Sequence, residues 1–192
     1  LARKQPGQLT FGTGGAGSGA HLATELFIQH TKVNMVHVPY KGVGPALIDV
    51  LAGQITMTFG AVPGVLPYAR SGRLRALGVT GAARIAALPS LPTVAESGVP
   101  GYEATLWFGV LAPAGVPAPI VTRLHATLAR ALQSQDMKDR LTAEGGEPIG
   151  SNPQAFYEFI KSEIERWAVV VKASGMRAEE GYESDATIPP ST

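Results

Sequence analysis

The hydrophobic positions in the first 80 residues alternate between strand-like and helix-like spacing. Short apolar runs predict strands at Leu9–Gly12, Val33–Val38, Ile55–Phe59 and Leu74–Val79. Between them, helical spacing predicts helices over 19–31, Pro45–Ala52 and 64–70. In the first helix, one buried face is expected to hold Leu22, Ala23, Leu26, Phe27 and His30. Strands and helices in alternation are typical of a mostly parallel sheet with right-handed crossovers, which predicts an α/β fold.

The second half of the chain has a different pattern. Residues 83–101 are rich in proline with a short helical piece at 93–97, and Tyr102–Ala112 suits a crossing between lobes or an edge strand. Two helical stripes follow, one formed by Ile120, Val121, Leu124, Leu128 and Leu132, the other by Phe156, Phe159, Ile160, Ile164, Trp167 and Val171. Asn152 or Ser151 can cap the second helix, with Pro153 in its first turn.

Composition and charge exclude several classes of protein. Hydrophobic residues make up 45% of the chain and charged residues 16%, which is ample for a folded core. The net charge of +1 comes without clusters of basic residues, which argues against binding of nucleic acid. The absence of cysteine excludes disulfides and thiolate metal sites. No apolar run approaches the length of a membrane span, so no direct membrane insertion is expected.

A glycine-rich segment, Gly12 to Gly19, lies between the first predicted strand and the first predicted helix. Glycines permit positive φ and let a ligand approach the backbone, and a helix start offers unpaired N–H groups to an anion. Ser18 can cap the helix or offer its hydroxyl to a ligand, but it cannot fully do both. The candidate ligand-binding residues in this segment are Thr13, Gly14, Gly15, Ala16, Gly17 and Ser18.

Two nucleotide-binding hypotheses fail at this segment. Gly12, Gly14 and Gly17 satisfy the pattern GxGxxG, but a dinucleotide site also needs an acidic residue about 20 positions farther on. Residues 34–40 contain none. A Walker loop would need lysine after Gly17, where this chain has Ser18. A cradle for a small anion and a purely structural tight turn remain as alternatives, and no cofactor is expected.

Further candidate ligand-binding residues lie just after the segment and at the ends of the next two predicted strands. His21 can help to orient the glycines, or it can serve in capping or packing. Tyr40 and Lys41 follow the second strand, where parallel sheets place ligand contacts, and Gly60 ends the third strand on the same edge. His21 and Glu25 stand four residues apart, which indicates a surface contact more than a metal site, so no metal is predicted. No Ser–His–acid pattern with a nucleophile elbow supports catalysis.

Several blocks of the sequence resemble the tripartite tricarboxylate transporter receptors, the Bug-type periplasmic solute-binding proteins. In chain order they are PGQLTFGTGGAGSGAHL at 6–22, VPYKGVGPALIDVLAGQ at 38–54, SGRLRALGVT at 71–80, LPSLPTVAESGVPGYEATLWFGVLAPAGVP at 88–117, and the helices over 124–175. The resemblance implies a type II periplasmic-binding-protein fold with two α/β lobes. It also implies a small carboxylate held by backbone amides and ordered water in the cleft.

On this resemblance, residues 7–110 correspond to a complete ligand-binding lobe two and residues 111–176 to the C-terminal helical return of lobe one. The family's N-terminal segment is expected to lie outside this chain, which is therefore an N-terminally truncated receptor carrying one side of the site. Residues 177–192 are expected to be a disordered tail, because apolar periodicity is lost there.

The implied function is that of a periplasmic receptor, not an enzyme. It would bind a dicarboxylate or tricarboxylate, an aromatic acid or an amino acid, and present it to the membrane permease subunits of the transporter. Two alternatives remain open. One is an α/β enzyme that uses the Gly12–Ser18 segment as an oxyanion site, and the other is an inactive receptor fragment.

Overall fold

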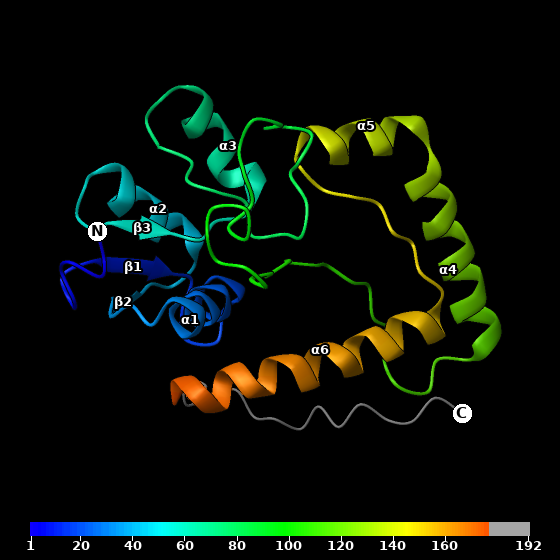
Figure 1. Cartoon of the computed structure of the whole chain (residues 1–192). Helices are drawn as coiled ribbons and strands as arrows, with labels where there is room; N and C mark the ends of the chain where they lie inside the picture. The colour runs from blue at the N-terminus through cyan, green and yellow to red at the C-terminus, as the bar shows by residue number, and fades with distance from the viewer. Residues whose placement is uncertain (177–192) are drawn as a thin grey trace.

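The computed structural model describes residues 1–176 and contains a three-stranded parallel sheet near its N-terminus. Strand β1 (Thr10–Thr13) lies between β2 (Val36–Pro39) and β3 (Met57–Thr58). Phe11 of β1 pairs with His37 on one side and with Met57 on the other. The parallel α/β arrangement expected for this part of the chain is therefore confirmed (Figure 1).

Three helices accompany these strands: α1 (Gly19–Thr31), α2 (Val43–Leu51) and α3 (Val62–Arg70). Successive side chains of a strand point to opposite faces of its sheet. Phe27 and Ile28 of α1 pack against the core cluster that contains Phe11, whereas a Cβ at the next residue, Gly12, would meet Ala46 of α2. Helices α1 and α2 therefore cover opposite faces of the sheet.

Helix α1 has the bounds expected from the sequence because both of its ends are capped. The Oγ of Ser18 accepts a hydrogen bond of 3.4 Å from the N–H of His21. At the other end Lys32 takes a left-handed φ of 56°, and its N–H donates to the carbonyl of Ile28 at 2.8 Å. One member of the expected buried face, His30, is instead exposed. It lies near the end of the helix, with its ring 6.1 Å from the Tyr102 ring in an edge contact.

The middle of the chain contains less regular structure than expected. The strand predicted at Leu74–Val79 is wrong, because this described segment makes only an isolated bridge between Val79 and Thr93. An apolar run needs a neighbouring strand to form a ladder, and here Leu77 is 65% exposed. The piece predicted as helical at 93–97 is a turn. In it the N–H of Thr93 donates to Glu96 at 2.7 Å, and the N–H of Glu96 donates to the Thr93 hydroxyl at 3.0 Å.

The segment 103–113 is extended, but in the described part of the chain it belongs to no strand. Tyr102 anchors its start, because this side chain is 2% exposed and its hydroxyl donates to the carbonyl of Ala23 at 3.0 Å. Farther along, Phe108, Val110 and Leu111 are 89%, 73% and 76% exposed. Of the two alternatives for Tyr102–Ala112, the edge strand is therefore absent from residues 1–176.

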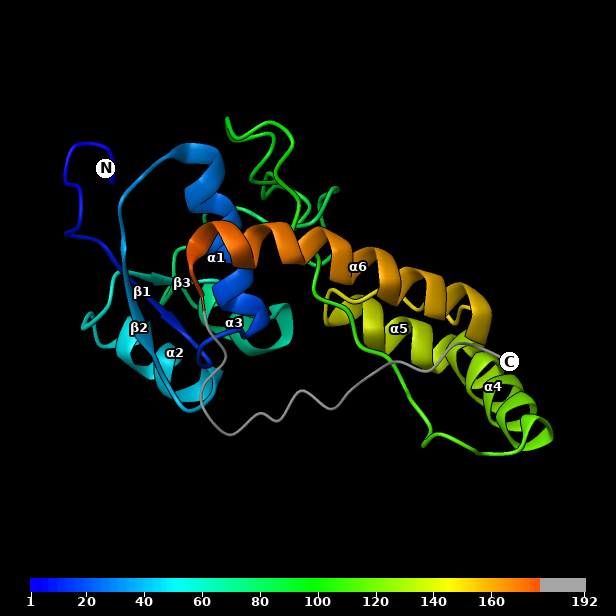
Figure 2. The same ribbon diagram turned by 90° about the horizontal axis from the view of Figure 1, so that it is seen from below.

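Three further helices follow: α4 (Ala118–Gln133), α5 (Gln135–Ala143) and α6 (Pro153–Ser174). Helices α4 and α6 were predicted from their stripes, whereas α5 was not. Asn152 rather than Ser151 caps α6, since its side chain accepts from the N–H of Ala155 at 2.8 Å. Figure 2 shows α4 and α5 away from the sheet and α6 running back to α1, where Gln29 donates to the carbonyl of Val170 at 3.0 Å.

The expected apolar stripe of α4 exists but is exposed. Ile120, Leu124 and Leu128 are 50%, 50% and 41% exposed, and α4 has no buried residue. None of the helices in residues 1–176 has the length and apolar character needed to cross a membrane. The disordered tail predicted for 177–192 lies outside the described residues.

Candidate functional site

The glycine-rich loop, Thr13–Ser18, joins the end of β1 to the start of α1. Gly15 has a φ of 121° and Gly17 a φ of 75°, conformations that residues with a Cβ rarely adopt. A Cβ at Gly14 would lie 3.3 Å from the backbone nitrogen of Val43, so this glycine permits close approach of the first turn of α2. A Cβ at Gly17 would meet nothing within 4 Å. The loop is therefore packed at Gly14 and open at Gly17.

The loop and the first turn of α1 leave backbone donors available to a ligand. The N–H of His21 binds Oγ of Ser18, and the N–H of Leu22 binds the carbonyl of Ser18 at 2.9 Å. Donors that have no acceptor among residues 1–176 include the N–H groups of Ala16, Gly19 and Ala20. Because these groups lie at the positive end of a helix dipole, they suit a carboxylate or another small anion.

Two histidines pack beside the loop. His21 is 6% exposed, and its ring stacks on that of His37 with centroids 3.9 Å apart. The ring of Phe11 stacks on the other side of His37 at 5.0 Å. Nδ1 of His21 accepts from the N–H of Gly17 at 3.2 Å, and Nε2 of His37 lies 2.7 Å from the hydroxyl of Thr13. Both rings therefore contact the loop directly.

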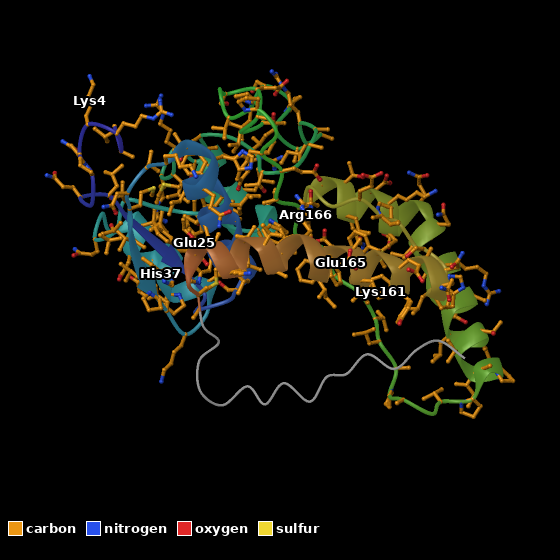
Figure 3. All side chains as sticks on the ribbon, turned by 60° about the horizontal axis from the view of Figure 1, so that its bottom comes forward. Lys4, Glu25, His37, Lys161, Glu165 and Arg166 are labelled. Carbon is orange, nitrogen blue, oxygen red and sulfur yellow. The ribbon has the colours of Figure 1, made fainter. Side chains whose placement is uncertain are left out.

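Burial determines the protonation of this histidine pair. It lowers the pKa of His21 from 6.5 to about 4, with a smaller contribution from the neighbouring His37. Burial likewise lowers the pKa of His37 and raises that of Glu25. Oε1 of Glu25 lies 3.6 Å from Nε2 of His21, and both side chains are under 20% exposed, so this is not the surface contact expected. Glu25 and His37 lie at the same end of the molecule (Figure 3).

His37 was not among the site residues predicted from the sequence. Its strand pattern, Val-His-Val, is common to many half-buried strands and carries no sign of a nearby loop. Only the register that pairs Phe11 with His37 places the ring beside His21. Residues 1–176 contain no group of three or more His, Cys, Asp or Glu side chains that could hold a metal ion.

Tyr40 is hydrogen-bonded to the loop, and Lys41 follows it along the chain. The N–H of Tyr40 donates to the carbonyl of Thr13 at 3.1 Å. The Tyr40 hydroxyl donates to Asp49 at 2.6 Å, and this bond, with burial, raises the pKa of the phenol. The phenol is therefore held by α2, whereas the side chain of Lys41 is exposed.

Packing explains other glycines around the site. A Cβ at Gly60 would lie 2.6 Å from Cγ1 of Val65, so close packing against α3 accounts for Gly60 without a ligand. A Cβ at Gly19 would lie 2.7 Å from Cδ1 of Leu106. Leu106, in the extended segment, is therefore a neighbour of the helix start that sequence spacing did not reveal.

Comparison with known proteins decides the family. The model of the family described as "Tripartite tricarboxylate transporter family receptor" matches residues 1–176. The chain belongs to this receptor family. Protein BugT of Bordetella pertussis is 39% identical over 175 residues, which are 91% of this chain and 54% of that protein. The tripartite tricarboxylate transporter receptors are solute receptors, not a family of enzymes.

Solved structures of such receptors have the same α/β fold. The structure of R. palustris Rpa4515 with adipate is 43% identical with a TM-score of 0.86, over 91% of this chain and 58% of that one. The periplasmic binding protein BugD is 30% identical with a TM-score of 0.78, over 92% of this chain and 60% of that one. The predicted periplasmic-binding-protein fold, one lobe with part of another, is confirmed, and the chain spans little more than half the length of these receptors.

Proposed function

We propose that the protein is an extracytoplasmic solute receptor that binds a small carboxylate for a tripartite tricarboxylate-type membrane transporter. The observation that carries the proposal is the set of N–H groups at Ala16, Gly19 and Ala20, which have no acceptor among residues 1–176. Backbone donors at a helix start bind anions. The similar Rpa4515 structure is described with adipate, a dicarboxylate. Location in the periplasm and delivery to permease subunits belong to the same proposal, since the similar BugD is a periplasmic binding protein.

The chemistry of the loop favours recognition of a carboxylate group over recognition of a particular solute. Between Thr13 and Ser18 the only side chain is the methyl group of Ala16. The Ser18 hydroxyl accepts from the N–H of His21 as the helix cap, but its proton can still be donated to a ligand oxygen, so the two roles compete less than the sequence suggested. Because the neighbouring histidines are neutral at pH 7, peptide dipoles supply most of the attraction. Dicarboxylates, tricarboxylates, aromatic acids and amino acids all present the group that such donors bind.

The proposal includes a division of the chain into 7–110, one lobe, and 111–176, the helical return of the other. The exposed apolar side chains of the extended segment and of α4 support it. A hollow of about 380 Å³ on α4, lined by Pro119, Ile120, Arg123, Leu124 and Thr127, lies on the same exposed stripe. Apolar surface of this extent is unfavourable in water. We propose that it packs against the part of the receptor that relatives carry beyond the matched residues, and that this part completes the ligand site.

Calorimetric titration of the chain with adipate tests the proposed function. A site with donors on one side is expected to bind adipate with a dissociation constant of about 1 mM or larger, that is, with a binding free energy of about −4 kcal/mol or closer to zero. Adipamide, which has the same length but no charge, is the matched control and is expected to give no heat. Equal heats from the two compounds would contradict carboxylate recognition. Micromolar binding of adipate would contradict the claim that this chain supplies only one side of the site.

A further inference from the structure

The two stacked histidines contact opposite ends of the glycine-rich loop. His21 comes from the first turn of α1 and His37 from β2, the next element along the chain, so the pair links the start of the helix to the strand that follows it. The rings are 22° from parallel, and Phe11 of β1 stacks on His37. Each ring is therefore held by packing, independently of any bond to the loop.

The bond at the C-terminal end of the loop defines the tautomer of His21. Nδ1 accepts the N–H of Gly17, so this nitrogen carries no proton. In the neutral ring the proton is then on Nε2, which faces Oε1 of Glu25 at 3.6 Å. A doubly protonated ring could not accept this bond, because both of its nitrogens would be donors.

The bond at the N-terminal end of the loop runs through Thr13. The Thr13 hydroxyl lies 2.7 Å from Nε2 of His37 and also contacts Gly15 twice. It accepts from the N–H of Gly15 at 3.3 Å and lies 3.2 Å from the Gly15 carbonyl. His37 thus holds the hydroxyl that engages both polar groups of Gly15.

These bonds add to the restraints on the loop from elsewhere, where the N–H of Gly42 donates to the Gly14 carbonyl at 3.2 Å and the N–H of Ser18 to the Gly15 carbonyl at 3.3 Å. Gly15 and Gly17 both have positive φ, and glycine loses more conformational freedom on ordering than any other residue. A loop that must hold backbone donors for a ligand needs its other donors engaged elsewhere. Here the histidine pair and Thr13 engage the N–H groups of Gly15 and Gly17, and the donors of Ala16, Gly19 and Ala20 remain.

We propose that His21 and His37 are positioning residues of the carboxylate site, which hold the loop in the one conformation that presents its free N–H groups to the ligand. The inference rests on the proposed function, because it assigns the pair a task at that same site. It makes neither histidine a ligand contact. It requires a neutral His21 with its proton on Nε2.

The tautomer is measured on the 192-residue chain labelled with ¹⁵N in its histidine rings. At neutral pH the account expects Nδ1 of His21 to give the signal of an unprotonated nitrogen and Nε2 that of a protonated one. The opposite tautomer, or a charged ring, would overturn the proposal. This measurement uses the unaltered sequence, so it decides the question even if a variant fails to fold.

Two variants of His21 separate positioning from simple packing. His21→Phe keeps a ring in the stack but removes the acceptor, whereas His21→Asn places an amide oxygen near the position of Nδ1. Amide hydrogen exchange at Gly17 is expected to be about tenfold faster in His21→Phe and close to the original rate in His21→Asn. His30→Phe, an exposed position on the same helix, is the matched control and should leave this rate unchanged. Equal exchange rates in all three variants would overturn the proposal.

Adipate then distinguishes failure of this inference from failure of the proposed function. The amide signals of Ala16, Gly19 and Ala20 should respond to adipate in the original chain and in His21→Asn, and respond at least fivefold less in His21→Phe at the same concentration. An undiminished response in His21→Phe overturns the positioning role and leaves the proposed function intact. A chain with the expected tautomer but no response to adipate at any amide overturns the proposed function, and with it the site that the pair would serve.

Discussion

The indole N–H of Trp107 donates a hydrogen bond of 3.0 Å to Oε2 of Glu163 and so joins the extended segment 103–113 to helix α6. Trp167 donates to the same oxygen at 3.0 Å, and Arg166 donates to Oε1 at 3.2 Å. Burial alone would raise the pKa of the Glu163 carboxyl, but these three donors outweigh it and leave the pKa below its usual value. The carboxylate is therefore the polar centre of the junction between the segment and the helix.

Replacing Glu163 by glutamine should destabilise the fold. The amide that replaces one carboxylate oxygen is a donor, so at least one of the indole or guanidinium donors loses its acceptor. A loss of about 2 kcal/mol in the free energy of unfolding is expected. Urea denaturation measures it, with Glu165→Gln as the control. Glu165 is exposed on the same helix (Figure 3), and a loss as large in Glu165→Gln would contradict the account.

Stability should fall when the pH is lowered from about 6.5 to about 4. Unfolded His21 binds a proton near pH 6.5, but the folded ring does so only near pH 4. The stabilisation is thus complete above pH 6.5 and is lost progressively toward pH 4, by on the order of 3 kcal/mol. The lowered pKa of Glu163 acts in the same direction at lower pH, whereas the raised pKa of Glu25 opposes it.

Urea midpoints at neutral pH and at about pH 4.5 measure this effect in the original chain and in His21→Phe. The variant should lose most of the pH dependence between these two values, because phenylalanine binds no proton. An equal drop in both proteins would show that another group causes the acid sensitivity.

Gly15→Ala should disturb the loop more than a matched change elsewhere. At φ 121° a residue with a Cβ is strained, and the expected cost is about 1–3 kcal/mol, or a loop rearranged to avoid it. Gly44→Ala in α2 is the control, because its Cβ would meet nothing and alanine favours a helix by up to about 1 kcal/mol. Thermal unfolding of both variants tests this, and a Gly15→Ala protein as stable as Gly44→Ala would contradict the described loop.

The exposed apolar surface of the extended segment should make the isolated chain self-associate. Phe108→Ser is expected to reduce association measured by sedimentation, with a change in unfolding free energy within about 0.5 kcal/mol, because Phe108 is 89% exposed. Leu77→Ser, 65% exposed at a different place in the chain, is the control. Equal association of the original chain and both variants would contradict a role for this surface.

Local signals in the sequence predicted the elements that depend on local chemistry. Helix α1 ends where expected because Ser18 and Lys32 cap it, and α6 begins at Pro153 because Asn152 caps it. The strand expected at Leu74–Val79 fails for the opposite reason. A strand requires a partner elsewhere in the chain, and apolar residues alone do not supply one. The same limit applies to the segment 103–113, which contacts helices but pairs with no strand in residues 1–176.

The residues of the candidate site also fall into two groups, those that local sequence signals predicted and those that depend on packing between distant elements. The glycines between a strand and a helix indicated the loop, because they report a local backbone requirement. His37 could not be found, since only the register of β2 on β1 brings it to His21. The bond from Tyr40 to Asp49 and the close packing of Gly60 against Val65 also depend on contacts between elements. Both residues were predicted to bind the ligand, and both have a structural role in the fold.

The most direct test of the carboxylate site is an adipate titration of the ¹⁵N-labelled chain followed at each backbone amide. The account predicts that the largest shifts occur at Ala16, Gly19 and Ala20, and that adipamide causes none of them. Arg123, in the hollow on α4, should change little. Largest shifts at Arg123, or equal shifts with adipamide at the loop, would contradict the claim that the glycine-rich loop binds the carboxylate.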